Sequence, residues 1–333
     1  MTTQQHNKQI VWTYYQQLTG ASPDVAALAR EALHPEVVWH GPHPINTLTG
    51  ADAVIDGFWR PLLHSVPDAR RDTQIFFAGQ SHGAAWVTGY GYFTGTFAAD
   101  WLGIPATGQP IAIRFGEVCR MVDGKIAAIY TILDLLDVMR QAGYRVLPPS
   151  RGAELIAPEP RTGDGVLLDP QAEAETQRSY DLVYAMLFDG LNNFDQADKA
   201  SMGMRRYWDA QMCWYGPCGI GAMHDLGGFE QAHQLPFLNA FPDRKATDQE
   251  ALFAEGSYVV AAGFPGVIAT HTGEYLGVAA SGQRVAMRVM DWWRRDGDLL
   301  VENWVLIDMI DVIRQCGVDL LARLRDQLTS ADA

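Results

Sequence analysis

The 333-residue sequence lacks several features that would assign it to a familiar class of protein. Its four cysteines show no C-x-x-C spacing and no secreted-framework pattern, so free thiols in a reducing cytosol are expected. No apolar run reaches the roughly 18 residues that span a bilayer, and the N-terminal residues contain no apolar signal segment. These absences predict a cytoplasmic protein with no membrane partner.

Motifs for cofactors and for catalytic nucleophiles are also missing. The sequence has no G-x-G-x-x-G before a helix, no G-x-x-x-x-G-K-[ST] loop, no H-E-x-x-H pair and no G-x-S-x-G elbow. We therefore expect no nucleotide cofactor and no metal. Positive charge is in the minority, because 25 Lys and Arg face 39 Asp and Glu and the net charge is −14. This balance argues against nucleic acid as a partner.

One stretch of the chain is present twice. Residues 134–143 read Asp-Leu-Leu-Asp-Val-Met-Arg-Gln-Ala-Gly, and residues 308–317 read Asp-Met-Ile-Asp-Val-Ile-Arg-Gln-Cys-Gly, with six of ten positions identical. Trp39-His-Gly-Pro42 likewise matches Trp214-Tyr-Gly-Pro217. An internal repeat of this length predicts the same structural unit twice. We assign residues 1–145 and 172–333 to the two domains and the proline-rich residues 146–171 to a linker.

Each repeat has the pattern of helices followed by an antiparallel meander. In the first repeat, strand-like runs cover residues 73–78, 84–97, 110–121 and 126–133, and a short helix follows them. In the second repeat, helices are expected at about 172–191 and 195–205. Helices followed by strands indicate the α+β class rather than a doubly wound parallel sheet. A helix packed into a bent sheet would leave a pocket between them.

Both repeats resemble the SnoaL-like polyketide cyclases, also known as ester cyclases, of the NTF2-like superfamily. The motifs that carry the resemblance are Leu102-Gly-Ile-Pro-Ala-Thr-Gly108, Arg120-Met-Val-Asp-Gly-Lys-Ile126, Thr270-His-Thr-Gly-Glu-Tyr-Leu-Gly277 and Trp304-Val-Leu-Ile-Asp308. The resemblance implies two cone-shaped, cystatin-like α+β barrels in tandem, packed as an intramolecular pseudo-dimer. It also implies acid/base chemistry without a cofactor. The family's acid/base aspartate ends the last strand, which corresponds to Asp308 and, through Tyr130-x-x-x-Asp, to Asp134.

The alternation of side chains along a strand shows which residues share a face with these two carboxyls. It puts Trp304 on the same face as Asp308, and Tyr130 on the same face as Asp134. If these aromatic residues line a pocket, each carboxyl points into it, and desolvation would raise its pKa toward neutrality. The alternative is that each aspartate N-caps the helix that follows it, which is a frequent role for aspartate.

Loop residues supply further candidates. His271 could polarise a carbonyl or move a proton, or it could be a hydrogen-bonded structural residue. The first repeat is expected to have Phe93 at the same position, followed by an insertion. His40, His43 and Tyr215 flank the Gly-Pro turns at the expected pocket mouth, where each could hydrogen-bond a substrate.

Two arginines and a tryptophan complete the set. Arg114 and Arg288 could bind an enolate or carboxylate oxygen, or they could lie on the sheet surface between the domains. Each precedes an acid by three residues, Glu117 and Asp291, and this spacing puts the two charges on opposite faces of a strand. Trp59 could stack on a substrate or belong to the core.

The function hypothesis is a cofactor-independent lyase, cyclase or isomerase. It would use aldol or retro-aldol chemistry on a small apolar, aromatic or polyketide-like molecule. Asp308 and Asp134 would move protons, and His271 or His40 would orient an oxygen. The alternative is a non-catalytic small-molecule-binding or assembly module. A third reading lets one repeat catalyse and the other stabilise it, and slightly favours the second. Substrate, reaction direction and any homo-oligomer stay open.

Overall fold

The computed structural model describes residues 2–19, 24–195, 198 and 200–331 of the chain. The chain forms two compact units. Unit 1 comprises Met1–Val146, Arg161–Pro170 and Leu321–Ala333, and unit 2 comprises Leu147–Pro160 and Gln171–Leu320. The segment between the repeats is thus divided between the units. The C-terminal residues, which the sequence assigned to the second domain, group with unit 1: Arg323 Nη1 donates a hydrogen bond to Val146 O at 3.1 Å.

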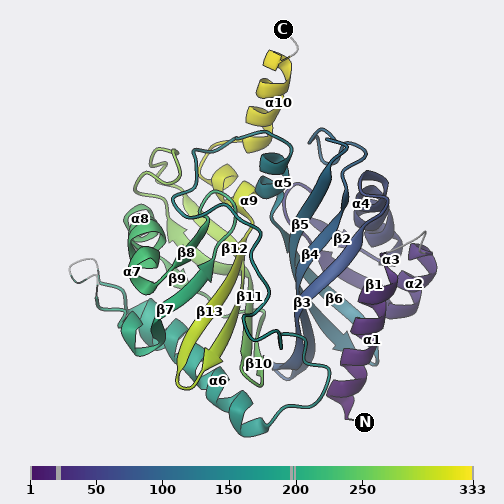
Figure 1. The fold of residues 1–333 in the computed structure, drawn as a ribbon, viewed down its shortest axis with the longest axis horizontal. Helices are drawn as coiled ribbons and strands as arrows, with labels where there is room; N and C mark the ends of the chain where they lie inside the picture. Colours follow the sequence, from purple (N-terminus) through teal and green to yellow (C-terminus); the bar gives the residue numbers. More distant parts are fainter. Residues whose placement is uncertain (1, 20–23, 196–197, 199, 332–333) are drawn as a thin grey trace. The chain divides into compact units, whose positions relative to one another are not determined.

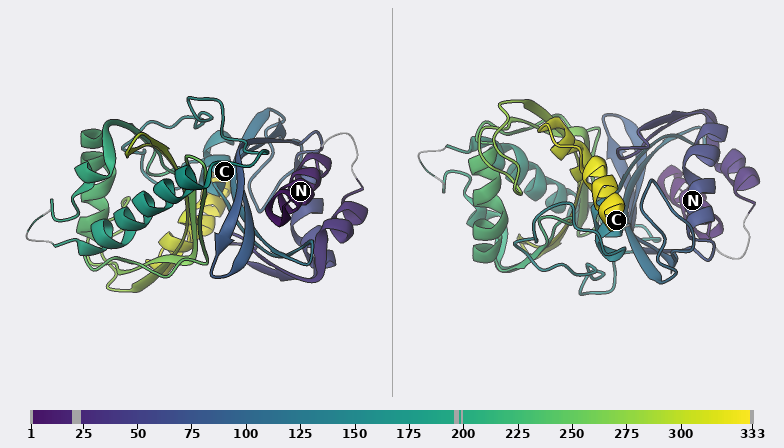
Figure 2. Two further views of the ribbon diagram at one scale, coloured as in Figure 1. Left: turned by 90° about the horizontal axis from the view of Figure 1, so that it is seen from below. Right: turned by 90° about the horizontal axis from the view of Figure 1, so that it is seen from above.

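Unit 1 is a six-stranded sheet with the helices of residues 3–65 gathered on one face (Figures 1 and 2). The strand order is β2-β1-β6-β5-β4-β3, in which β3 to β6 form an antiparallel meander and β1 pairs parallel with β6. The predicted four-strand meander is therefore confirmed. The elements are α1 (Thr3–Gln17), α2 (Val25–Ala32), β1 (Leu33–His40), β2 (Thr47–Thr49), α3 (Ala51–Val54), the π-helical η1 (Ile55–Trp59), α4 (Arg60–Ser65), β3 (Arg70–Ser81), β4 (Ala84–Thr96), β5 (Pro110–Val122), β6 (Lys125–Leu133) and α5 (Leu135–Gln141).

Large aromatic side chains fill the space between the helices and the sheet of unit 1. Tyr14 and Tyr15 come from α1 and Trp59 from η1, and each is at most 3% exposed. Trp59 Nε1 donates a hydrogen bond to Tyr14 Oη at 3.1 Å, so both polar groups are satisfied inside the core. Trp59 is therefore a core residue in this structure, the alternative reading of its role.

Unit 2 repeats this plan. Its strand order is β10-β11-β12-β13-β7-β8, with β13 parallel to β7 and the other neighbours antiparallel. The elements are α6 (Glu173–Ala185), the π-helical η2 (Met186–Gly190), the 3-10 turns η3 (Leu191–Asn193) and η4 (Met204–Arg206), β7 (Trp208–Tyr215), β8 (Ala222–His224), α7 (Leu226–Phe229), the π-helical η5 (Glu230–Gln234), α8 (Leu235–Ala240), β9 (Lys245–Ala246), β10 (Ala251–Glu255), β11 (Tyr258–Thr270), β12 (Arg284–Asp296), β13 (Leu299–Ile307) and α9 (Met309–Gln315). The last helix, α10 (Leu320–Ala331), groups with unit 1 from its second residue on.

The second predicted helix of this repeat is wrong in the part that the structure describes. Only Met204–Arg206 forms a 3-10 turn there, and residues 196, 197 and 199 lie outside the described residues. Gly203 precedes the turn with φ +60°, a conformation that interrupts a helix and favours glycine. The chain therefore turns where the periodicity alone suggested that it continues.

Matching hydrogen bonds align the two repeats residue by residue. Asp68 accepts from the amide and the hydroxyl of Thr96, and Asp243 accepts the same two bonds from Thr270. The next residue, Phe97 or His271, exchanges backbone hydrogen bonds with a Gly-Gln pair in both repeats. His271 thus corresponds to Phe97 and not to Phe93, and no insertion separates the repeats here.

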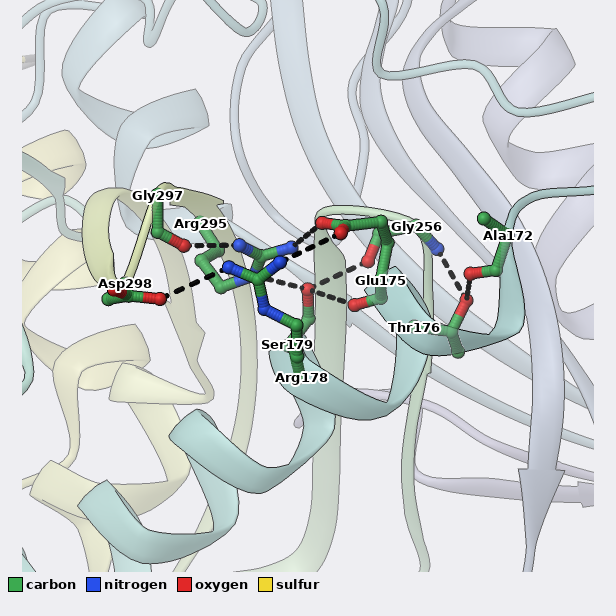
Figure 3. Close-up of polar contacts among 9 residues, drawn as sticks. All are labelled: Ala172, Glu175, Thr176, Arg178, Ser179, Gly256, Arg295, Gly297 and Asp298. Carbon is green, nitrogen blue, oxygen red and sulfur yellow. Dashed lines mark hydrogen bonds and ion pairs between the residues drawn. The ribbon is translucent and has the colours of Figure 1, made fainter.

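A charged cluster pins α6 to the sheet of unit 2 (Figure 3). Arg295, on β12 and 5% exposed, donates from Nε to Ser179 Oγ at 2.8 Å and forms an ion pair with Glu175. Ser179 Oγ in turn donates to Gly256 O at 2.7 Å, at the turn between β10 and β11. The helix that leads to Met186 and Leu187 is therefore tied to two hairpins.

Replacing Arg295 by methionine is expected to lower the free energy of unfolding by about 2–3 kcal/mol, because the buried Ser179 and the helix end lose charge-assisted hydrogen bonds. Urea denaturation measures this change. Arg178 is the control, since its side chain is 53% exposed and pairs with Glu175 and Asp298 at the surface. Its methionine variant should lose less than about 1 kcal/mol. Equal losses in both variants would contradict the importance of the buried contacts.

Candidate active site

Asp134 and Asp308, the two acids singled out from the sequence, are helix caps in the structure. Asp134 accepts a hydrogen bond from Asp137 N at 3.2 Å and begins α5, and Asp308 accepts one from Asp311 N at 3.3 Å and begins α9. Asp308 also pairs with Arg288 at 3.2 Å. This geometry satisfies the orphan amides of the first helical turn. It matches the alternative reading of both residues.

The aromatic residues on the same strand faces have partners of their own. Trp304 is fully buried, donates from Nε1 to Pro158 O at 2.9 Å, and lies 5.5 Å from Tyr215 between ring centroids. In unit 1, Tyr130 stacks on His40 with ring centroids 4.4 Å apart. These contacts bring His40 and Tyr130 together in one repeat, and Tyr215 and Trp304 together in the other.

The remaining predicted residues are dispersed. His271 Nδ1 lies 3.0 Å from Ser281 Oγ, and its ring stacks on Phe241, which fits the structural alternative. Arg114 donates from Nε to Tyr90 Oη at 2.7 Å and is buried in unit 1. His43 lies part-buried in the loop between β1 and β2.

Unit 2 contains a cavity of about 140 Å³ between its helices and its sheet. Neither Asp308, Trp304 nor His271 lines it, so the expectation that Trp304 and Asp308 point into this pocket is wrong. The sheet side of the wall is the opposite face of β12 and β13, made by Met287, Val289, Asp291, Trp293, Asn303, Val305 and Ile307. The helix side includes Met186, Leu187, Phe229, His233, Gln234, Phe237 and Leu238.

Asp291 is the acidic side chain of this cavity wall. It accepts a hydrogen bond from Asn303 Nδ2 at 3.3 Å, across the β12–β13 pair, and no cation pairs with it among the described residues. Burial in the apolar wall raises the pKa of the Asp291 carboxyl to about 7, and the Asn303 hydrogen bond opposes this rise. A carboxyl with this pKa exchanges protons readily at neutral pH.

His233 and Arg244 face the same cavity. The His233 ring stacks on Trp214 with centroids 4.3 Å apart, and its Nδ1 atom is buried without a hydrogen-bond partner. Desolvation, with a contribution from Arg244, lowers the pKa of His233 to about 3, so the imidazole is neutral. A neutral imidazole can accept or donate one hydrogen bond to a bound molecule without carrying charge.

The corresponding region of unit 1 is filled by an ion pair. Arg71 Nη2 lies 3.4 Å from Glu117 Oε1, and Thr131 donates to Glu117 Oε2 at 3.0 Å. The Arg71 guanidinium carbon lies 3.3 Å from the centroid of the Tyr15 ring. Glu117 corresponds to Asp291, but its charge is neutralised by the arginine.

The strand register shows which residue of unit 2 stands at the position of Arg71. Arg71 pairs with Phe93 in the β3–β4 ladder, as Ala246 pairs with Val267 in the β9–β11 ladder. Alanine therefore stands in unit 2 where unit 1 has the arginine, and Ala246 lines the cavity. Removing this long side chain opens space and leaves Asp291 without its cation.

Comparisons with known proteins identify the family. The model of the SnoaL-like polyketide cyclases matches residues 10–142 and 228–316, which is well over half of the chain and includes both repeats. The chain belongs to the SnoaL-like polyketide cyclase family. Each unit has the NTF2-like α+β fold of that family, so the chain contains two copies of the fold in tandem. No curated protein sequence matches the chain.

Solved structures similar to the chain each cover about one repeat. A protein of Jannaschia sp. CCS1, named as a SnoaL-like polyketide cyclase, is 19% identical over 44% of this chain and 96% of its own, with a TM-score of 0.38. IdmH of Streptomyces antibioticus, named as a polyketide cyclase, is 21% identical over 41% and 99%, with a TM-score of 0.35. A Catenulispora acidiphila protein with a ketosteroid isomerase-like fold is 20% identical over 41% and 94%, with a TM-score of 0.32.

The residues that line the cavity and that the sequence did not single out as site candidates are Asp291, Asn303, His233 and Arg244. A signal for Asp291 was present, because a lone acid stands between Met290 and Trp292 in an apolar strand. Among the described residues there is no cluster of three or more histidine, cysteine or acidic side chains placed to hold a metal. In the same part of the chain, no helix is long and apolar enough to cross a membrane.

Proposed function

We propose that this SnoaL-like protein is a cofactor-independent acid/base enzyme whose reaction takes place in the cavity of unit 2. The observation that carries the proposal is Asp291, a part-buried carboxyl in the cavity wall with no cationic partner in the described chain and with a pKa raised to about 7. Strong pKa perturbation inside a pocket is typical of catalytic acids and bases. The placement of chemistry at Asp291 replaces the earlier hypothesis for Asp308.

The cavity suits a small aromatic substrate. An apolar cavity of about 150 Å³ in a protein core accepts benzene, which is close to the 140 Å³ found here. Trp214 and Trp293 add flat apolar walls against which an aromatic ring can pack. A single ring with a short side chain therefore fits better than an extended polycyclic polyketide.

The chemistry in this cavity would be proton transfer next to a carbonyl group. The ionised Asp291 carboxylate removes a proton from the carbon beside the carbonyl, and the electron pair moves onto the carbonyl oxygen to give an enolate. Neutral His233 donates a hydrogen bond to that oxygen, and Asn303 holds the Asp291 carboxyl in place. Return of the proton to the same or another carbon gives isomerisation, and attack of the enolate on a second carbonyl gives aldol ring closure.

Unit 1 has a different role in this proposal. Its acid at the corresponding position, Glu117, is held by Arg71, and the buried pair occupies the space that is open in unit 2. We therefore assign catalysis to unit 2 and stabilisation of the protein to unit 1. This is the division of labour that the sequence left as one of three readings.

The experiment that tests the proposal measures exchange of the benzylic protons of phenylacetone with D2O by proton NMR. The exchange rate is expected to rise with pH to a plateau, with a midpoint near 7, because the ionised form of Asp291 is the base. A protein-dependent rate with a midpoint near pH 4 would point to an ordinary exposed carboxyl instead. Binding of phenylacetone without exchange above the buffer rate would leave a non-catalytic ligand-binding module, and the proposal would be wrong.

A further inference from the structure

Arg244 brings a positive charge into the wall of the unit 2 cavity. The residue is 7% exposed, and its Nη2 donates to Leu191 O at 2.6 Å and contacts Met202 Sδ at 3.9 Å, both neutral groups. Within the described residues no carboxylate lies at ion-pair distance from it. Desolvation lowers the pKa of Arg244 to about 10, which still leaves it charged at neutral pH. A buried unpaired charge is costly to the fold.

The comparison between the repeats makes this arginine unusual. Asp68 and Asp243 correspond through their matching bonds to Thr96 and Thr270, so the residue after each also corresponds. Unit 1 has Ala69 at the position of Arg244. In unit 1, Arg71 neutralises Glu117. In unit 2, Arg244 stands at a different position and pairs with no acid in the described chain. An anionic group on a bound ligand would provide the negative charge that the Arg244 guanidinium lacks in the described chain.

The surface beside the cavity also carries positive charge. A hollow of about 480 Å³ shares Met204 and Gln234 with the cavity wall and is lined by Arg205 and Arg206. Arg205 Nη2 lies 3.9 Å from Glu230 Oε2. Arg206 has no ion pair among the described residues. In a chain of net charge −14, two adjacent arginines at this place attract anions locally against the overall field.

We infer that the ligand of the unit 2 cavity is a small aromatic carboxylate, whose carboxylate pairs with Arg244 while its ring packs between Trp214 and Trp293. A guanidinium binds a carboxylate through two parallel N–H donors, which fixes orientation as well as charge. The inference deepens the proposed function by naming the class of substrate for the same site. It rests on the proposed function only for the step at Asp291, and the binding can be tested alone.

The test compares phenylacetate with phenylacetamide, which has nearly the same shape but no charge, by isothermal titration calorimetry. Wild-type protein is expected to bind phenylacetate roughly 10–100-fold tighter, the range that charge-assisted hydrogen bonds give. In the Arg244→Gln variant this preference should disappear, and in Arg244→Lys part of it should remain. Equal affinities of the wild type for the two compounds, or no detectable binding of phenylacetate, would overturn the inference.

Two further variants separate this result from the outcome for catalysis. Arg178→Gln removes the same charge from an exposed site of unit 2, so it should keep the preference for phenylacetate. Loss of the preference in Arg178→Gln would show that net charge, and not Arg244, decides the affinity, and the inference would fail. Asp291→Asn should retain phenylacetate binding. If it also retained proton exchange, the proposed reaction would be wrong while the carboxylate site stood.

Discussion

Replacing Asp291 by asparagine is expected to slow the exchange of phenylacetone protons by about 10²–10⁴-fold, the usual contribution of a general acid or base. Asparagine has nearly the same shape and can still accept the hydrogen bond from Asn303, but it cannot take up a proton. Since the part-buried side chain lies in an apolar cavity wall, bulk water is poorly placed to substitute for the carboxylate. The loss should therefore appear in the rate at saturating phenylacetone more than in the affinity for it.

The matched control is Asp308→Asn, alone and together with Asp134→Asn. Asparagine caps helices about as well as aspartate, so α5 and α9 should still form. Because Asp308 does not line the cavity, the single and double variants should exchange phenylacetone at close to the wild-type rate. If Asp308→Asn folds and loses exchange while Asp291→Asn keeps it, the acid at the end of the last strand is the base, and the proposed role of Asp291 is wrong.

Much of the fold follows from the sequence because the repeat and the meander are local patterns. The ten-residue duplication predicted two copies of one unit, and strand runs separated by short turns predicted the antiparallel order. The parallel pairing of β1 with β6, and of β7 with β13, could not be derived in this way. Those pairs join segments far apart in the chain, and only tertiary packing brings them together.

The choice of strand face is where sequence reasoning failed. Alternation correctly places Trp304 and Asp308 on one face and Asn303 and Val305 on the other. It does not say which face meets the helices when both are buried, and Trp304 and Val305 are at most 4% exposed. Because neither face of β13 is polar, the sequence does not show which face is turned toward the cavity. The prediction therefore placed Trp304 in the cavity wall. In the structure it packs against Tyr215 and Pro158 instead.

Arg244 shows a second limit of the sequence. It follows the Pro-Asp turn that matches Pro67-Asp68, in a region where the repeats differ by one residue in spacing. Sequence alignment alone could set either Arg70 or Ala69 opposite it. The matching hydrogen bonds of Thr96 and Thr270 decide the alignment of the two repeats. They show that the buried arginine of unit 2 occupies a different position from the buried arginine of unit 1.

The stability of the protein should also reveal the raised pKa of Asp291. The unfolded chain releases this proton near pH 4, whereas the folded chain holds it until about pH 7. The folded state therefore binds more protons than the unfolded state between these pH values, and the free energy of unfolding falls as pH rises through this window. The fall amounts to about 4 kcal/mol, since each unit of pKa is worth about 1.4 kcal/mol, and it ends above about pH 7.

Asp291→Asn removes this titration, so the variant is expected to match the wild type near pH 4 and to exceed it by up to about 4 kcal/mol at pH 8. Urea denaturation followed by tryptophan fluorescence at pH 4.5, 6 and 8 measures the difference, in which the other titrating groups cancel. Asp308→Asn gives the opposite sign at pH 8, because it loses the ion pair with Arg288. A difference for Asp291→Asn that stays constant across this range would mean that its carboxyl ionises normally, and the base in the cavity would lose its physical foundation.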